Sequence, residues 1–475
     1  MNERLSNWLK KEILPRRKRA APSSTARQIA RLFRLFVLLL LCLFLCWRLL
    51  LWHDVNRQFD RIRAAGYPVS GAELNAWQPP VPDPENGALV LTQAFALVRN
   101  FPDARSNEVA KLKNPARTNV WTPTTHELVA AYVQTNAPAL ARVREALLLS
   151  RFRYPVDFSY GPETPLPHLT KLREMAGIAA LAAALDAEEG RADQWPDQVE
   201  LQLKLAGTLD GEPCLISHLV RNRIIGMAVR ATERSLNNAS PGAEACQRLQ
   251  AAFARASQTN SLPLALAGER AKMIPLFRMS WQEIQSDSED EGQESKPHEP
   301  HRYSGKPWFP LWLTGYFERD LNFFLQYWDK SISLSALPPP ANLTLTNYLE
   351  SAVAAAQRRW DLMSGFYLLG LSKVIVSEAS TQAGMRLATT ALAIERFRRE
   401  RGRLPGELKE LTPQFLDAVP TDPFDGAPLR YRLLDRGYII YSVDADGHDD
   451  GGREPPEIKK SSDTNSYDIT FIVEH

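Results

Sequence analysis

One long apolar run stands out in the pattern of hydrophobic and polar positions along the chain. Residues 35–52 are apolar except for Arg48. As a helix this run rises about 27 Å, close to the thickness of the hydrocarbon core of a bilayer. Arg48 lies near the far end of the run, where its long side chain can reach the lipid headgroups. The run therefore predicts a transmembrane helix over 35–52.

The charges that precede this run predict its orientation. Residues 1–34 carry ten basic and two acidic side chains, a net charge of +8 within a chain whose formal net charge is +2. Basic segments stay on the cytoplasmic side of a membrane. We expect a single-pass protein of the cell inner membrane, with a cytoplasmic tail over 1–34 and a periplasmic or otherwise extracytoplasmic body. A cleaved signal peptide is the alternative, but the run ends at Trp52-His53-Asp54, which lacks the small residues that cleavage requires.

After the apolar run, polar and apolar positions alternate with the period of helices that have one buried face. Residues 53–85 read as a helical stalk followed by a proline-rich linker. From 86 to 375, apolar residues recur every three or four positions, which is the period of helices with one buried face. The spacing predicts an irregular domain of helical hairpins over 86–375, in which Asn86 caps the first helix and a helix over about 345–370 is the last.

Two segments interrupt this helical pattern. Residues 286–306 are acidic and almost free of apolar side chains, which predicts a disordered loop. An aromatic-rich segment follows over 308–328. It has two interpretations, a patch that binds a membrane surface or a carbohydrate, or a helix packed into the core. The second is favoured because Phe317, Phe324 and Trp328 share one helical face.

The last hundred residues, 376–475, change character again. A helix is predicted over 380–400, ended by Gly402, and three strands over 429–433, 438–443 and 469–473. One helix packed on a small antiparallel sheet is the natural arrangement of these elements. The expected fold class is therefore mainly α, with a transmembrane helix, a helical-hairpin domain and a C-terminal α+β head.

An acidic loop between the second and third strands is the most informative motif. It contains Asp444, Asp446, Asp449 and Asp450 among glycines, and Asp468 precedes the last strand. Carboxylate oxygens in a tight, glycine-containing loop suit Ca²⁺, which takes about six to eight oxygen ligands. The alternative is a solvated acidic hairpin without a cation. The spacing is not that of an EF-hand, which needs a Glu at the twelfth position of its loop.

The order of these motifs resembles a known family. The turn Asp422-Pro423-Phe424-Asp425-Gly426, the loop Ser442-Val443-Asp444-Ala445-Asp446-Gly447 and the closing Asp468-Ile469 are similar to the C-terminal half of the major pseudopilin of type II secretion. That resemblance implies a bound Ca²⁺. It also implies a ligand set, namely the carboxylates of Asp446 and Asp468 and the backbone carbonyls of Val443 and His448.

The chain departs from the pseudopilin pattern in two respects. Ser466 stands where the family has a further acidic residue, and Asp449, Asp450 or Asp463 could replace that ligand. More than 300 residues also separate the apolar run from the C-terminal segment, and in pseudopilins the two are joined directly. Assembly into a filament is therefore not implied. The rest of the body resembles uncharacterised membrane-anchored proteins, a likeness that carries no known activity.

Candidate catalytic chemistry is sparse. The chain has eight His, and it lacks the phosphate-binding, dinucleotide-binding, nucleophile-elbow and zinc-protease motifs. Cys214 and Cys246 could pair in an oxidising compartment, and Glu269 and Arg270 read either as a buried ion pair or as surface charges. The middle of the chain is nearly neutral, which argues against binding to nucleic acid.

A binding or scaffold role, rather than an enzyme, is the favoured function. Two alternatives stay open. One is an extracytoplasmic hydrolase with its site in the helical domain. The other is a component of secretion or pilus assembly, for which envelope or secretion proteins would be the partners.

Overall fold

A computed structural model describes residues 24–100, 112, 117, 120–280, 282–283, 308–368, 370–454 and 467–474. The predicted loop over 286–306 lies outside these residues. The chain divides into two compact units, Met1–Asn56 and Arg57–His475. The second unit is called the body below.

The N-terminal helix α2 spans Ser24–Ala64 and is longer than the apolar run. No Gly or Pro interrupts these residues, so the helix includes the predicted stalk and ends just before Gly66, whose φ is 81°. Its most apolar stretch has a mean hydropathy of 2.6 and none of it is buried. By length and composition α2 is a candidate membrane anchor or signal sequence. The region Leu362–Arg401 passes the same test among the described residues, but 47% of its apolar stretch is buried, as in a core helix.

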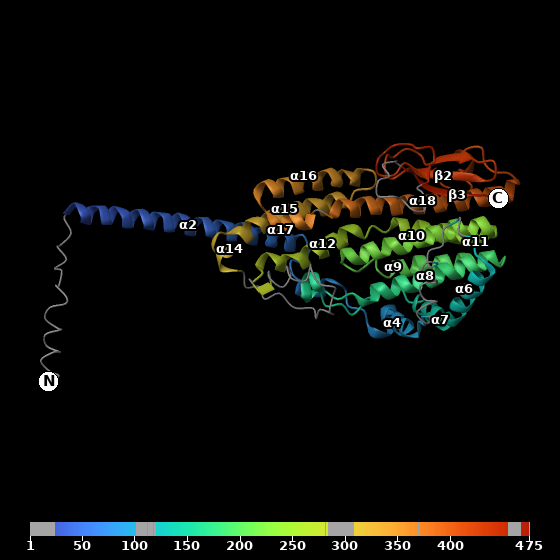
Figure 1. The fold of residues 1–475 in the computed structure, drawn as a ribbon, viewed down its shortest axis with the longest axis horizontal. Coiled ribbons are helices and arrows are strands. Elements are labelled where there is room, and N and C mark those ends of the chain that lie inside the picture. The colour runs from blue at the N-terminus through green and yellow to red at the C-terminus, as the bar shows by residue number, and fades with distance from the viewer. Residues whose placement is uncertain are drawn as a thin grey trace, which may run out of the picture. The chain divides into compact units, whose positions relative to one another are not determined.

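The body is mainly helical, as predicted (Figure 1). The α-helices are α3 Gly71–Trp77, α4 Gly87–Leu97, α6 Pro123–Thr135, α7 Ala137–Ala146, α8 Pro167–Glu188, α9 Trp195–Gly207, α10 Leu215–Asn238, α11 Ala243–Gln258, α12 Leu262–Met273, α14 Phe309–Leu313, α15 Tyr316–Ser335, α16 Thr344–Arg359 and α17 Leu362–Leu368. Short 3₁₀ turns are η1 Asp83–Glu85, η2 Phe158–Glu163, η3 Ile274–Arg278 and η4 Ala341–Leu343.

The structure confirms one predicted helix boundary and corrects another. Asn86 caps α4, because its Oδ1 accepts a hydrogen bond from the Ala88 amide at 3.1 Å. The prediction of a single helix over 345–370 is wrong, since it divides into α16 and α17 at Trp360, a left-handed residue with φ of 60°. The Asp361 amide donates to the Ala356 carbonyl at 2.9 Å and closes α16 at this point.

The C-terminal segment has the predicted arrangement of one helix on a small antiparallel sheet. Helix α18 spans Leu371–Arg401, begins before the predicted start at 380 and ends at Gly402, with φ of 69°. A 3₁₀ turn, η5 Leu408–Leu411, follows. The strands β1 Arg430–Leu433, β2 Tyr438–Ser442 and β3 Ile469–Val473 pair antiparallel in the order β1-β2-β3.

One hydrophobic core runs through the helices and the sheet. It joins Trp195 and Phe253 of the helical hairpins to Leu392 of α18 and to Tyr438 and Phe471 of the sheet. Helix α18 packs against α10 and α11 as well as against β2 and β3. The position 375/376, predicted as a domain boundary, therefore does not coincide with a gap in the core.

The aromatic-rich segment 308–328 divides between core and surface. Phe317, Phe324 and Trp328 are at most 4% exposed, so the predicted buried face of this helix is confirmed. Phe309 and Trp312, which belong to α14, are exposed. The core interpretation is therefore confirmed for α15, and the surface-binding interpretation stays a prediction for α14.

Candidate metal centre

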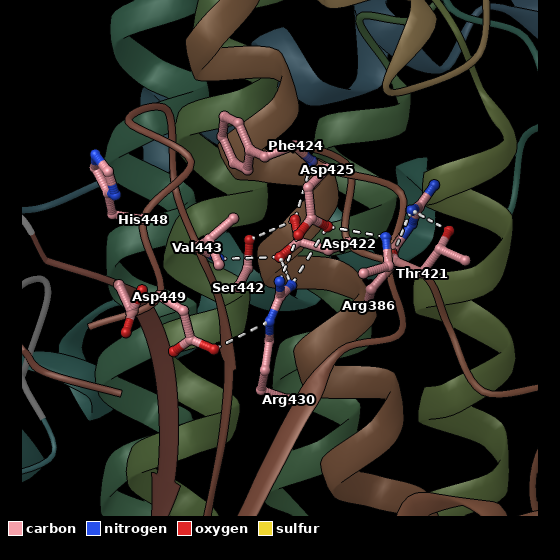
Figure 2. A network of polar contacts seen from close by, with 12 residues as sticks. Arg386, Thr421, Asp422, Phe424, Asp425, Arg430, Ser442, Val443, His448 and Asp449 are labelled. Atoms are coloured by element: carbon pink, nitrogen blue, oxygen red, sulfur yellow. Dashed lines mark hydrogen bonds and ion pairs between the residues drawn. The ribbon is translucent and has the colours of Figure 1, made fainter. Parts of the chain in front are cut away.

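A buried carboxylate, Asp422, holds the base of the acidic loop. Its side chain is fully buried and lies at the centre of the network in Figure 2. Oδ1 accepts hydrogen bonds from Ser442 Oγ and from the Phe424 amide, both at 2.9 Å. Oδ2 accepts from the Val443 amide at 2.9 Å and from Arg430 Nη1 at 2.7 Å. Asp422 thus joins the end of β2 to the turn over 422–426.

Arg430 on β1 supplies the positive charge next to this network. It pairs with Asp422 and Asp425, and its Nε lies 3.7 Å from Asp449 Oδ2 in the acidic loop. The hydrogen bond from Arg430 holds the pKa of Asp425 below its usual value. Arg430 therefore balances part of the negative charge of the loop.

The exposed loop residues are arranged by their own turns. Asp446 Oδ1 accepts from the His448 amide, and Asp449 Oδ1 accepts from the Gly451 amide, both at 3.0 Å. All three predicted ligands in this part of the loop, Asp446, His448 and Asp449, are exposed. In Figure 2 the ring of His448 points away from the Asp422 network.

Two carboxylate oxygens in this region are buried without a hydrogen-bond donor. Asp468 is 3% exposed, and its Oδ2 accepts from the Gly452 amide at 2.7 Å. Among the described residues, which leave out 455–466, neither its Oδ1 nor the Oδ2 of Asp450 has a hydrogen-bond partner. Burial raises the pKa of Asp468, and the nearby charges of Asp449 and Asp450 raise it further. Buried polar atoms without partners are costly, so these two oxygens indicate a place for a cation.

The structure brings together only part of the predicted ligand set. Asp449, Asp450 and Asp468 influence one another electrostatically, and the amide of Val443 is fixed on Asp422. Across the described residues, no three His, Cys, Asp or Glu side chains are arranged as a metal site. The geometry therefore favours Asp450 and Asp468 as carboxylate ligands, and the remaining oxygens that Ca²⁺ needs would come from backbone or water.

A polar cleft, which the sequence did not reveal, lies between α10, α18 and β3. It has a volume of about 470 Å³, and Gly226 and Gly384 lie among its lining residues. Glu233 also lines it. Burial raises the pKa of Glu233 to about 7, although its carboxylate accepts a hydrogen bond from the Ile472 amide at 2.8 Å. The other polar lining side chains are Asn222, Arg223, Arg230, Ser377, Ser380, Thr381 and Thr470.

A buried network containing His218 lies beside Asn222, one of the lining residues. His218 Nδ1 is 2.9 Å from Ser261 Oγ, and Nε2 is 3.1 Å from Glu378 Oε2. Asn222 Nδ2 also donates to Glu378 Oε2, at 2.8 Å. Burial alone would raise the pKa of Glu378, but hydrogen bonds and the charge of His218 lower it to about 2. Ser261 is 5% exposed and does not line the cleft. The network of Ser261, His218 and Glu378 therefore serves the packing of α10 against α18.

A second buried histidine lies near the N-terminus of α8. His168, close to the start of α8, is 7% exposed, and its Nε2 lies 3.0 Å from Glu212 Oε1. Ser217 Oγ donates to the same oxygen at 2.5 Å, and the ring of Tyr154 stacks on His168. This network also lies in the interior of the body.

The cysteines of the body are not paired. Cys214 and Cys246 are both buried and free. Burial raises the pKa of both thiols, that of Cys246 to about 12. Glu269 and Arg270 are buried, and each pairs with a different residue, Glu269 with Lys272 at 3.3 Å and Arg270 with Asp329.

Comparison with known proteins adds no relative: no family model, no curated protein and no solved structure matches this chain. The likeness to pseudopilins therefore stays an expectation drawn from sequence motifs. What can be inferred about function rests on helix α2, the acidic loop and the cleft.

Proposed function

We propose that this chain is a single-pass membrane protein of binding or scaffold type, whose body lies outside the cytoplasm and whose acidic loop is stabilised by Ca²⁺. The anchor is supported by the exposed apolar stretch of α2 and by the net charge of +8 over residues 1–34. The same charge asymmetry supports an extracytoplasmic body, and the inner membrane with a periplasmic body is part of this proposal.

The observation that supports the calcium part is a pair of buried oxygens, on Asp450 and Asp468, that receive no hydrogen bond from the part of the chain that the structure describes. A carboxylate oxygen that lacks a donor is satisfied when it binds a hard cation. Because the loop is assembled only in the folded body, Ca²⁺ would bind the folded state and stabilise it, by about 2.7 kcal/mol at a concentration one hundred times the Kd. The carboxylate of Asp449 lies 3.7 Å from Arg430 Nε. When Ca²⁺ binds, this carboxylate would either coordinate the cation or keep its contact with the arginine.

Thermal unfolding of the full chain in detergent tests this proposal. Millimolar Ca²⁺ should raise the melting temperature by a few degrees above its value in chelator. Asp468→Asn should abolish that rise. In the presence of chelator, the melting temperature of this variant should be no lower than that of the wild type. The substitution replaces a carboxyl group whose pKa is raised by burial with a neutral amide.

Asp435→Asn is the matched control, since Asp435 is an exposed aspartate in the β1–β2 turn. It should keep the full response to Ca²⁺. A wild-type melting temperature that Ca²⁺ leaves unchanged, or a full response in Asp468→Asn, would contradict the calcium site.

A hydrolase in the body is a second candidate, and one observation favours it. Glu233, with a pKa of about 7, lies in the cleft beside Arg223 and Arg230, a combination suited to acid–base chemistry on an anionic or polar ligand. The Ser261–His218–Glu378 set does not add a nucleophile, because Ser261 is buried away from the cleft. Binding is therefore the better-supported use of this cleft. A role in secretion or pilus assembly, with envelope proteins as partners, has support only from the motifs of the acidic loop.

A further inference from the structure

The body has an exposed apolar patch built from two separate segments. The patch comprises six residues, each between 40% and 74% exposed. Phe309, Trp312 and Leu313 belong to α14, Trp360 lies in the turn that follows α16, and Leu362 and Phe366 belong to α17. Tyr316 connects the segments, because its hydroxyl donates to the Trp360 carbonyl and accepts from the Leu362 amide, both at 3.0 Å. Helix α15 also packs against both α14 and α17. These six residues are called the aromatic patch.

Trp360 shows that the exposure of the patch is not incidental. Its φ of 60° lies in the left-handed region, where Gly is easily accommodated and a bulky side chain is strained. Its side chain is 74% exposed, so packing in the core does not explain the choice of Trp. Arg358 and Arg359 lie in the last turn of α16, just before Trp360 in the sequence, and Arg359 pairs with Asp361 at 2.7 Å and lies over the ring of Phe323.

The aromatic patch lies at the end of the body where the chain enters from the apolar run. Gln58 donates its side-chain amide to the side chain of Asn322 on α15, the helix that joins the two segments of the patch. Only six residues lead from Trp52 to Gln58, so they can span no more than about 20 Å. Figure 1 shows α14 and α17 together at one end of the body, far from the sheet.

We propose that the aromatic patch docks on the lipid bilayer in which residues 35–52 are anchored. Trp and Phe side chains favour the interface between the hydrocarbon core and the headgroups of a bilayer. Segment 286–306, which precedes α14, has almost no apolar side chains that could cover the patch instead. Docking would hold the body against the membrane by its α14–α17 end and keep the acidic loop away from the surface. The proposal rests on the membrane anchor of the proposed function.

Quenching by labelled lipids tests the docking in the full chain. A Cys42→Ala/Cys46→Ala background leaves Cys214 and Cys246, which are buried, as the remaining thiols. An environment-sensitive fluorophore is attached at Phe309→Cys or Phe366→Cys, one in each segment of the patch, and at Leu148→Cys, which is 86% exposed on the connection after α7. Each variant is reconstituted as one copy per nanodisc, with or without lipids that carry a doxyl quencher.

Fluorescence at positions 309 and 366 should be quenched several-fold more strongly than at position 148. Equal quenching at all three positions would overturn the proposal. The proposal would also be overturned if the fluorophores at positions 309 and 366 were shielded from water but were not quenched by the lipids. That result would indicate that protein, rather than lipid, covers the patch. Failure of the chain to enter nanodiscs at all would instead contradict the membrane anchor, so the two outcomes are distinguishable.

Discussion

Glu378 and Asp468 are both buried carboxylates, and their pKa values move in opposite directions. Glu378 is surrounded by donors from His218, Asn222 and Gln382, which favour its charged form more than burial disfavours it. The Asp468 carboxylate receives only backbone donors among the described residues, from Gly452 and Asp450, and these lower its pKa less than burial raises it. The number of donors therefore decides whether a buried acid stabilises the fold by itself or needs a cation.

The pH dependence of unfolding should show the contribution of Glu378. Its folded pKa of about 2 lies below the ordinary value of 4.5, so its stabilising contribution is complete above pH 4.5 and is lost as the pH falls toward 2. The shift corresponds to about 3 kcal/mol. Urea unfolding between pH 4.5 and 2.5 should show a smaller loss of stability for Glu378→Gln than for the wild type. At pH 7 this variant should already be less stable, because His218 loses its buried partner.

Glu350→Gln is the control for this experiment, because Glu350 is exposed on α16. It should follow the wild-type pH dependence. Parallel curves for Glu378→Gln and the wild type over the acid interval would show that the carboxylate is not ionised in the folded body.

Removal of the Asp422 carboxylate should be among the most damaging single changes in the C-terminal segment. Asp422→Ala leaves the buried donors of Ser442 and Val443 without an acceptor and takes away a partner of Arg430. Loss of one partner from such a buried charged network costs about 3–5 kcal/mol. Chemical unfolding should detect this loss, and the response to Ca²⁺ should disappear with it because the base of the loop is no longer held.

Asp417→Ala, at an exposed position, provides the comparison for Asp422→Ala. A loss of stability equal in both variants would mean that the hydrogen bonds of Asp422 add little.

The residue types of the acidic loop were readable from the sequence, but the contacts that decide their roles were not. Asp468 was singled out because it precedes a strand after a glycine-rich acidic loop. The link from Asp422 to Ser442 and Val443 crosses twenty residues, and the link from His218 to Glu378 crosses one hundred and sixty. No local pattern records such pairs, since they depend on how β2 and α18 are placed.

At the scale of elements, the close packing of α12 depends on a glycine in its interior. A Cβ at Gly268 would lie 1.9 Å from the carbonyl oxygen of Pro213. Helix α12 and the loop that precedes α10 are therefore in direct backbone contact at this point. Gly268→Ala should therefore destabilise the body by about 1–3 kcal/mol, although Ala ordinarily favours a helix. Thermal unfolding measures this effect.

Gly211→Ala offers a matched test, because a Cβ at Gly211 would meet nothing within 4 Å. It should be neutral or slightly stabilising. If both substitutions behave alike, α12 does not approach Pro213 as closely as the structure shows.

Helices were predictable where the apolar period is regular, and less so where a distant contact sets the boundary. The helical period predicted over 86–375 is matched by regular helices such as α8 and α11. The break between α16 and α17 was missed because Asp361, which follows Trp360, is held by Arg319 from α15 through a hydrogen bond of 3.1 Å. The local sequence around Trp360 carries no Gly or Pro that would signal a stop.

At the scale of the whole molecule, the C-terminal sheet is part of a larger core. The change of period after 376 suggested a separate head, but α18 is buried on several faces and contacts helices and strands alike. A helix that is apolar on most sides belongs in an interior rather than on a boundary. The stability of the acidic loop is therefore coupled to the packing of α10 and α11, and effects of Ca²⁺ should appear in the unfolding of the entire body.

The orientation of the chain in the membrane is the prediction on which the largest part of the proposed function depends. A net charge of +8 before residue 35 should keep the tail in the cytoplasm and place position 148 outside. In a Cys42→Ala/Cys46→Ala background, a membrane-impermeant maleimide should label Leu148→Cys in intact spheroplasts and Ser6→Cys only after lysis. Buried Cys214 and Cys246 should stay unlabelled, which makes the parent background its own control.

The same labelling separates an anchor from a cleaved signal sequence. If 35–52 is an anchor, the labelled product should have the mass of the full chain and stay with the membrane fraction, because an apolar helix of this length is not released into water. A shorter product in the soluble fraction would show cleavage. Labelling of position 6 before lysis, with position 148 protected, would reverse the orientation and place the acidic loop in the cytoplasm, where resting Ca²⁺ is too scarce to fill a millimolar site.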